Sequence, residues 1–246
     1  MCSVILLHRP GHPWPILLAA NRDERLDRPW RPPGRHWPER PDLLAGQDGL
    51  AGGTWLGLAI TAGVVAAVLN RPGSLGPEAG KRSRGELPLL ALAEASAAAA
   101  AERLAALDAG QWRPFHLLIA DRAGAWFLRG LGEGRPQARP LPPGLWMVTS
   151  AEPNDVSHPR IRRALPRFAA AAPPDPECED WATWETLLAD RAEDAPEGQA
   201  AALAIPPADG FGTVCSSLIA LAQDGRARWR FCDRPAGEAP FRPCLA

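Results

Sequence analysis

Short apolar runs broken by Gly, Pro and charged residues recur along this chain, and they predict β-strands paired in hairpins. The first pair covers residues 2–8 and 15–20, with a turn that contains Pro and Gly between them. The next apolar run ends at Leu69 and is divided at residues 61–63, which predicts a second hairpin. Further hairpins are expected from residues 115–121 with 125–129 and 213–222 with 226–231, and one more strand from residues 145–149.

Helical segments separate these hairpins. The strongest covers residues 86–107, which are rich in Ala and Leu. It places Pro88 in its first turn, where a missing backbone N–H is tolerated. Shorter helical segments are expected at residues 159–171, 181–191 and 198–204.

The order of hairpins and helices predicts the class of fold. Because it shows no βαβ regularity and no repeat, we expect an α+β fold built on antiparallel sheets. Residues 29–41 are crowded with Pro, Arg and Trp, and they predict an irregular loop. The Pro-rich residues 136–144 and 172–180 are short enough to be surface loops, so we expect a single domain over residues 1–246.

Composition excludes several classes of function. The net charge is −1 at pH 7 with no basic stripe, which argues against a nucleic-acid partner. No apolar run approaches the ~18 residues that a membrane span needs, so we expect a cytoplasmic protein without membrane insertion. Five widely spaced cysteines contain no CxxC pair, and Pro10 and Gly11 separate His8 from His12. Neither a disulfide framework nor a metal site is therefore expected.

The candidate chemistry lies at the start of the chain. Cys2 follows Met1, and removal of Met1 would place a thiol and a free α-amine on one residue. These groups titrate at about 8.5 and about 8, so the residue would hold a nucleophile and its own base. The first hairpin returns residues 21–24 to a position beside Cys2. We therefore expect a processed N-terminus and a thiol pKa below its ordinary value.

Five ordered blocks carry a family resemblance: the Met-Cys start, Ala-Ala-Asn-Arg-Asp-Glu at 19–24, Gly-Gly-Thr-Trp-Leu-Gly at 52–57, Asn70, and Arg-Gly-Glu-Leu at 84–87. With these the chain resembles the NRDE family, whose eukaryotic members are the transport and Golgi organization proteins. The resemblance implies a fold of the N-terminal nucleophile (Ntn) hydrolase type. This fold is a four-layer αββα sandwich with two antiparallel sheets between layers of helices.

The resemblance also implies roles for individual residues. Cys2 would attack an amide carbonyl, Asp23 would hold the α-amine, and Asn70 would donate to the oxyanion. Arg22 would favour the thiolate or bind an anionic group of the substrate. Amidases of this type carry an Asn after the strand that corresponds to residues 145–149, where this chain has Ser150.

Three further residues are expected around the substrate: Asn21, which would also fix the turn, Trp55, which would fill the core or line a pocket, and Ser150.

Two functions follow from the resemblance. One is a cysteine amidohydrolase that acts on the linear C–N bond of a small-molecule amide and requires no cofactor. The other is a non-catalytic protein that binds or moves heme or an acyl ligand such as a lipid or acyl-CoA. In that case His8, His36 or Cys2 would ligate the iron of heme, and the sequence does not select among them.

Overall fold

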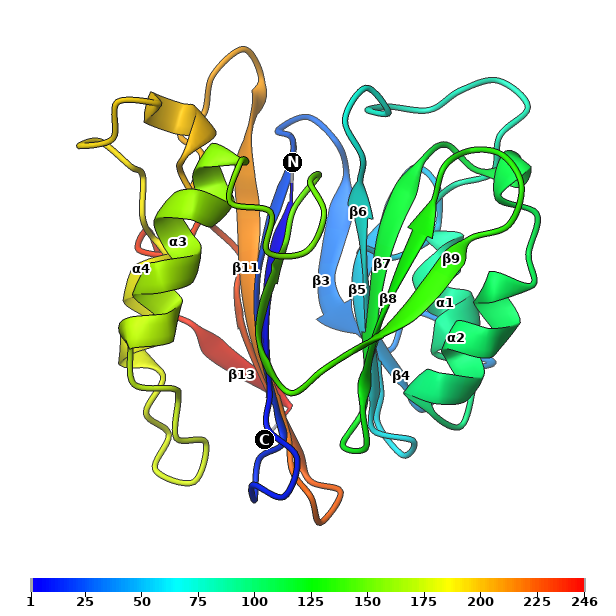
Figure 1. Ribbon diagram of the computed structural model, residues 1–246, viewed down its shortest axis with the longest axis horizontal. Helices are drawn as coiled ribbons and strands as arrows, with labels where there is room; N and C mark the ends of the chain where they lie inside the picture. Colours follow the sequence, from blue (N-terminus) through cyan, green and yellow to red (C-terminus); the bar gives the residue numbers. More distant parts are fainter. Residues whose placement is uncertain (1, 246) are drawn as a thin grey trace.

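Two antiparallel β-sheets pack face to face in the computed structural model, which describes residues 2–245 (Figure 1). The expected removal of Met1 concerns a residue outside this range. In spatial order, the first sheet contains β10 (Gly144–Val148), β1 (Ser3–His8), β2 (Ile16–Arg25), β11 (Phe211–Leu221), β12 (Ala227–Cys232) and β13 (Arg242–Leu245). The second contains β3 (Trp30–Gly34), β4 (Leu43–Asp48), β5 (Leu56–Ala59), β6 (Val64–Asn70), β7 (Phe115–Ala120), β8 (Ala125–Gly130) and β9 (Gln137–Leu141).

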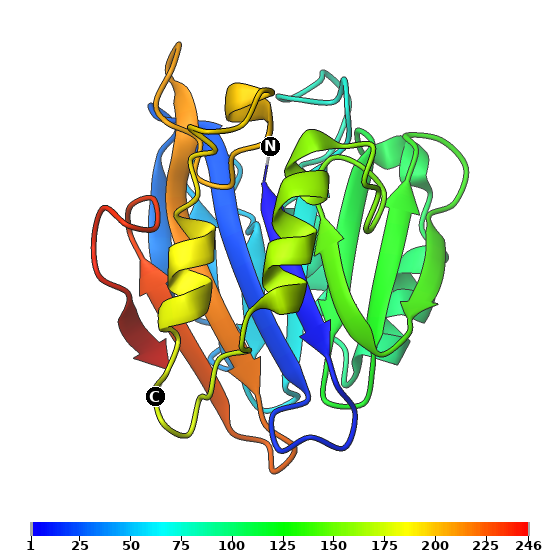
Figure 2. The same cartoon turned by 60° about the vertical axis from the view of Figure 1, so that its left-hand side comes forward.

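Helices cover the outer face of each sheet. The helices are α1 (Glu86–Ala91), α2 (Ala97–Ala105), α3 (Pro159–Ala170) and α4 (Ala182–Leu188), with 3-10 turns at Ala109–Gln111 and Gly198–Ala200. Figure 2 shows α3 and α4 lying across the first sheet, and Figure 1 shows α1 and α2 outside the second. The four layers are thus helix, sheet, sheet and helix.

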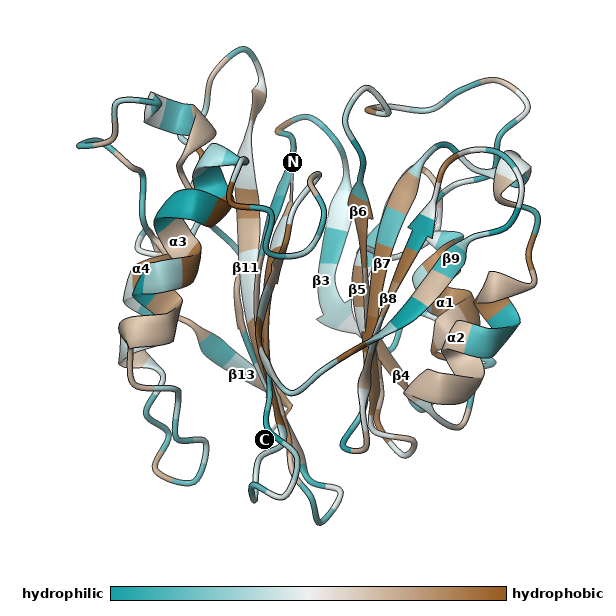
Figure 3. Ribbon diagram, viewed as in Figure 1, coloured by the Kyte–Doolittle hydropathy of each residue, from teal (hydrophilic) through white to brown (hydrophobic). Residues whose placement is uncertain are grey.

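Alternating side chains build three apolar layers from these elements. On β1, Val4 and Leu6 face the core between the sheets, whereas Ile5 faces α3 and α4. On β6, Val65 joins the core between the sheets. Alternate residues of β6 pack instead against α1 and α2, and Figure 3 shows the resulting hydrophobic colouring of both sheets. Both sheets are covered on both faces, which explains their nearly continuous apolar strands.

The predicted hairpins are confirmed, but three predictions about local structure were wrong. Residues 136–144 are not a surface loop throughout, because Gln137–Leu141 forms β9 and pairs with β8. Residues 86–107 do not form one helix, because Ser96 caps a second one: its Oγ accepts a hydrogen bond from Ala99 N at 3.1 Å. Residues 29–41 are not wholly irregular, because β3 pairs with β4 at the edge of the second sheet. Prolines are tolerated in β3 because an edge strand leaves half of its N–H groups unpaired.

Candidate functional site

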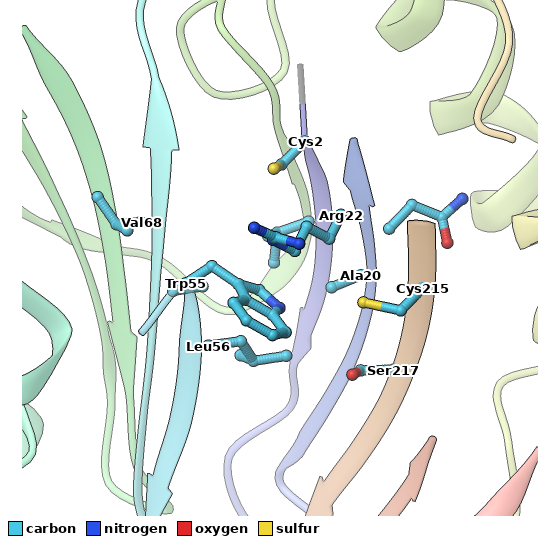
Figure 4. A pocket seen from close by; sticks show the side chains of 11 residues that line it. Cys2, Ala20, Arg22, Trp55, Leu56, Val68, Cys215 and Ser217 are labelled. Carbon is cyan, nitrogen blue, oxygen red and sulfur yellow. The ribbon is translucent and has the colours of Figure 1, made fainter. Parts of the chain in front are cut away.

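Cys2 lies directly before β1, in a row of residues that faces the space between the sheets. In the pairing of β1 with β2, Ser3 is opposite Asn21, so the next pair along the register joins Cys2 to Arg22. On the far side of β2, Arg22 is opposite Cys215 of β11. Figure 4 shows the side chains of Cys2, Arg22 and Cys215 directed toward Trp55 of the second sheet. The prediction that the first hairpin brings residues 21–24 beside Cys2 is confirmed.

These side chains border a small, mostly apolar pocket. Its wall consists of Cys2, Val4, Ala20, Asn21, Arg22, Trp55, Leu56, Ala67, Val68, Cys215 and Ser217. The cavity measures about 10 Å³, close to the minimum volume that holds a single water molecule. A substrate larger than water therefore requires the two sheets or the adjoining loops to move apart.

Arg22 is the charged group of this pocket. Its side chain is only 4% exposed, and its guanidinium carbon lies 4.3 Å from the centre of the Trp55 ring. Its Nη2 lies 3.6 Å from Glu24 Oε2 and 3.8 Å from Asp48 Oδ2. Its Nη1 is buried and makes no hydrogen bond to any residue between 2 and 245. A buried donor without a partner costs free energy, so this N–H is a ready site for an acceptor atom of a ligand.

Asp48 is the carboxylate that anchors this charged cluster. Burial opposes its ionisation, but hydrogen bonds from Arg28 and from the amides of Ala51 and Leu50 hold the pKa of Asp48 below its ordinary value. The Arg28 Nε to Asp48 Oδ2 distance is 2.7 Å. The carboxylate therefore stays charged near neutral pH and balances part of the charge of Arg22.

Trp55 has a place in the pocket because a glycine faces its ring. A Cβ atom on Gly46 would lie 2.3 Å from the Trp55 ring. Any side chain at position 46 would therefore overlap the ring. Trp30 packs edge-on against Trp55 with ring centres 5.9 Å apart. The prediction that Trp55 fills the core or lines a pocket is consistent with this position, since its ring does both.

The glycines of two sequence motifs meet beside the pocket. A Cβ on Gly53 would lie 2.5 Å from the carbonyl carbon of Gly85, and Thr54 N donates to Gly85 O at 2.9 Å. The two backbones approach so closely that only glycine fits at Gly53. Next to this contact, Arg84 Nη1 donates to Ser74 O at 2.7 Å and ties down the connection after β6. Burial, together with the charge of Arg113, lowers the pKa of Arg84 to about 10.

Asp23 points away from the pocket, into the layer between the first sheet and α3. Its Oδ2 accepts a hydrogen bond from Arg160 Nη1 at 2.9 Å, and its Oδ1 accepts one from Thr213 Oγ1 at 2.7 Å. Arg160 Nη1 also donates to Ser3 Oγ at 2.9 Å. All of these residues are buried. The network joins α3 to the start of β1, and so it fixes the backbone that presents Cys2.

Burial of Cys2 disfavours the thiolate form of its side chain. Burial raises the pKa of Cys2, and the nearby Asp23 carboxylate raises it further, against smaller effects such as the charge of Arg22. The Cys2 Sγ donates a long, weak hydrogen bond to Asp23 O at 3.8 Å. The expected lowering of the thiol pKa concerns a chain that begins at Cys2, so it stays a prediction. Activation thus requires the free α-amine, a bound ligand or an opening of the pocket.

The side-chain amide of Asn21 bonds to the helix layer, and Asn70 lies outside the pocket wall. The Asn21 Nδ2 donates to Leu188 O and Leu203 O, each at 2.9 Å. Its Oδ1 accepts a hydrogen bond from Ser216 Oγ, so the amide fastens β2 to the helix layer. Asn70 ends β6 and is half-buried, and it is not among the residues that line the pocket.

Ser150 lies at the same end of the first sheet as Cys2. Val4 is opposite Val148, so continuing the register by two residues brings Ser150 opposite Cys2. Ser150 is buried. Asn154 does not supply the amide of the corresponding Asn, because its Nδ2 donates to Leu145 O at 2.9 Å and its Oδ1 accepts from Met147 N at 2.7 Å.

The residues suggested as iron ligands are not gathered in one place. His8 ends β1, at the opposite end from Cys2, and His36 lies beyond β3 against Pro32 O. Within residues 2–245, no three His, Cys, Asp or Glu side chains form a group that could hold a metal ion. In the same part of the chain, no helix combines the length and the apolar character needed to cross a membrane.

Sequence reasoning missed Arg160 and Thr213, the partners of Asp23. One signal was available for Arg160, because α3 buries Ile161, Ala164 and Phe168 on one face and Arg160 lies on that same face. A charged residue on an apolar helical face is normally paired. Nothing in the sequence identifies Asp23 as that partner, because the two positions are far apart along the chain.

Comparison with known proteins adds the family and the fold. The family model described as Transport and Golgi organisation 2 matches residues 1–235. No curated protein matches the sequence. A solved structure of a Caenorhabditis elegans N-acylethanolamine-hydrolyzing acid amidase (NAAA) ortholog is similar with a TM-score of 0.57 and 11% identity, over 88% of this chain and 92% of that one. At this identity the likeness shows the fold alone, and it confirms the expected Ntn-hydrolase-like sandwich.

Proposed function

This chain belongs to the Transport and Golgi organisation 2 family, and from that premise we propose that it is a cysteine amidohydrolase with Cys2 as the N-terminal nucleophile. One observation carries the proposal. The Cys2 thiol borders the same small pocket as Arg22, whose buried Nη1 has no hydrogen-bond partner among the described residues. Amide cleavage uses a nucleophile and a donor that stabilises the oxyanion, and Cys2 and Arg22 can supply these two groups.

The reaction begins with the free α-amine of Cys2, which processing of the chain exposes. The amine takes the thiol proton, and the sulfur attacks the carbonyl carbon of an amide. The tetrahedral intermediate collapses to a thioester, and the leaving amine departs with the proton. Water then attacks the thioester, which releases the carboxylic acid and returns a proton to the thiol. Hydrolysis therefore needs no cofactor.

Arg22 and Asp23 act from opposite faces of β2. Arg22 Nη1 donates to the oxyanion of the tetrahedral intermediate, and loss of one such donor typically raises the barrier by about 3 kcal/mol. Asp23 holds the backbone at Cys2 through Arg160 and Ser3. Asn70 ends β6, the strand of Val68 in the pocket wall, and Ser150 follows β10 in register opposite Cys2; we assign both as further polar groups for the substrate.

Hydrolysis of a panel of N-acyl amides by the purified, processed chain tests the proposal. We expect acid release that Cys2→Ala abolishes and that Arg22→Gln slows by about 100-fold, the typical effect of one lost oxyanion donor. Cys178→Ala is the matched control, because Cys178 is an exposed thiol remote from the pocket wall. Equal turnover by wild type and Cys2→Ala would refute a role for Cys2 as nucleophile.

A non-catalytic function in binding an apolar ligand such as heme or an acyl chain is the second candidate. It is favoured by the mostly apolar wall of the pocket, which suits an apolar ligand. Heme titrated into the purified chain should then give a saturable Soret shift that Cys2→Ala weakens. His8→Ala and His36→Ala test the other two ligands, and the absence of a shift at micromolar heme would remove heme as cargo.

A further inference from the structure

A second cavity lies between the sheets, on the inner face of β8 and β9. It measures about 120 Å³, which is room for several water molecules, and it is lined by Phe127, Arg129, Gln137, Ala138, Arg139 and Glu152. In the pairing of β8 with β9, Phe127 is opposite Arg139 and Arg129 is opposite Gln137, so these four side chains project on one face. Phe127 belongs to the core between the sheets, which identifies that face as the inner one.

The cavity carries more positive than negative charge. Glu152 Oε1 accepts hydrogen bonds from Arg129 Nη1 at 3.1 Å and from Arg71 Nη1 at 2.8 Å. Burial disfavours its charge, but the two arginines hold the pKa of Glu152 below its ordinary value. Arg139 pairs with no described acid, and its guanidinium carbon lies 5.2 Å from the centre of the Phe127 ring. Three guanidinium groups therefore face one carboxylate.

A neutral histidine forms the wall of this cluster. His116 is fully buried, packs against Phe127 with ring centres 4.9 Å apart, and has Nδ1 3.2 Å from Thr149 O. Since Thr149 O can only accept, Nδ1 carries the proton and Nε2 is left to accept from Arg71 Nη1. His116 thus adds no charge of its own, and it holds the Arg71 guanidinium toward Glu152.

Strand pairing connects this cavity to the Cys2 pocket. Leu69, His116, Arg129 and Gln137 form one row across β6, β7, β8 and β9. Val68 of β6 lines the Cys2 pocket, and β8 is the second strand from β6 in the same sheet. Both cavities open between the same two sheets, so one ligand can occupy them together once the sheets part.

We propose that the cavity at Arg129 and Arg139 is an anion subsite, which binds a carboxylate or phosphate group carried by the substrate at a distance from the scissile amide. The assignment of the substrate class rests on the proposed hydrolase function. The anion site is inferred from the charged residues of the cavity and does not depend on that function. Arg139 supplies the unpaired charge. Arg129, which donates to Glu152 Oε1 and to Gln137 Oε1, adds a positive charge beside it. The floor of Phe127 and His116 shields these groups from water on one side.

Binding of inorganic phosphate to the purified chain, measured by calorimetry at constant ionic strength, tests the site directly. We expect saturable binding that Arg139→Gln weakens at least tenfold, as loss of a charge-assisted hydrogen bond implies. Arg139 is exposed, so this variant should fold. Arg242→Gln on the edge strand β13 is the matched control, since it removes the same charge from another sheet. No phosphate binding by wild type, unchanged affinity in Arg139→Gln, or an equal loss in Arg242→Gln would overturn the proposal.

A pair of amides that differ only in a terminal carboxylate tests the substrate class. We expect wild type and Arg242→Gln to prefer the carboxylated amide by at least tenfold in kcat/KM, and Arg139→Gln to lose that preference. A preference that persists in Arg139→Gln would overturn the assignment of the substrate. If neither amide reacts, the hydrolase function fails while phosphate binding still decides whether the anion site exists.

Discussion

His116 makes the stability of this protein depend on pH in a defined direction. Burial, with a contribution from the charge of Arg71, lowers the pKa of His116 from 6.5 to about 4 in the folded chain. In the unfolded chain the imidazole titrates at its ordinary value. Between these two values unfolding takes up a proton, so acid favours the unfolded state. The stabilisation is complete above pH 6.5 and is lost as the pH falls toward 4.

The magnitude follows from the two pKa values. At 1.36 kcal/mol for each pKa unit, the full effect of the change from 6.5 to about 4 is about 3 kcal/mol. About 2 kcal/mol of this is already lost at pH 5 relative to pH 8. For a chain of this length such a loss lowers the Tm by about 4–8 °C.

Urea unfolding of wild type and His116→Gln at pH 8 and pH 5 measures the effect. Gln keeps a donor and an acceptor but does not titrate. The His116→Gln variant should therefore lose about 2 kcal/mol less unfolding free energy than wild type between pH 8 and pH 5. His12→Gln, at an exposed histidine whose pKa burial lowers without the large shift of His116, is the control and should reduce the loss by far less than His116→Gln does. Equal losses in His116→Gln and wild type would refute the buried, neutral state of His116.

Two other substitutions test the packing around Cys2. Arg160→Met removes the 2.9 Å ion pair to the buried Asp23 carboxylate and should lower the unfolding free energy by about 3–5 kcal/mol. Adding Asp23→Asn should recover part of this loss. Wild-type stability in Arg160→Met would contradict the buried pair. Gly46→Ala puts a methyl group into the Trp55 ring and should cost about 1–3 kcal/mol with a shift in Trp fluorescence. Gly124→Ala, where the nearest atom is 4.0 Å away, should cost less, and an equal cost would contradict the close contact at Gly46.

Much of the fold was predictable because apolar periodicity and turn residues act locally. The pairing of residues 2–8 with 15–20 follows from a short turn between two apolar runs, and it was sufficient to bring Cys2 beside Arg22. Edge strands were harder to predict. β3 and β9 contain prolines and exposed residues, and their strand conformation depends on a neighbouring strand rather than on their own composition.

The candidate site was predictable only in part, because its polar contacts depend on tertiary packing. Strand alternation directs the Arg22 side chain into the pocket and the Asp23 side chain toward α3. The sequence motif that contains both residues does not show that they face opposite sides of the sheet. The raised pKa of Cys2 is a consequence of burial by the second sheet. Glu152 meets Arg71 and Arg129 only because the residues after β10 reach across to β8.

The mass of the purified chain after brief incubation with an N-acyl amide and an acid quench tests the central claim most directly. The proposal predicts a chain that begins at Cys2 and carries one acyl group, mapped by peptide sequencing to the Cys2 thiol and absent in Cys2→Ala. A chain that retains residue 1 and acquires no acyl group from amides that it does hydrolyse would contradict Cys2 as the N-terminal nucleophile.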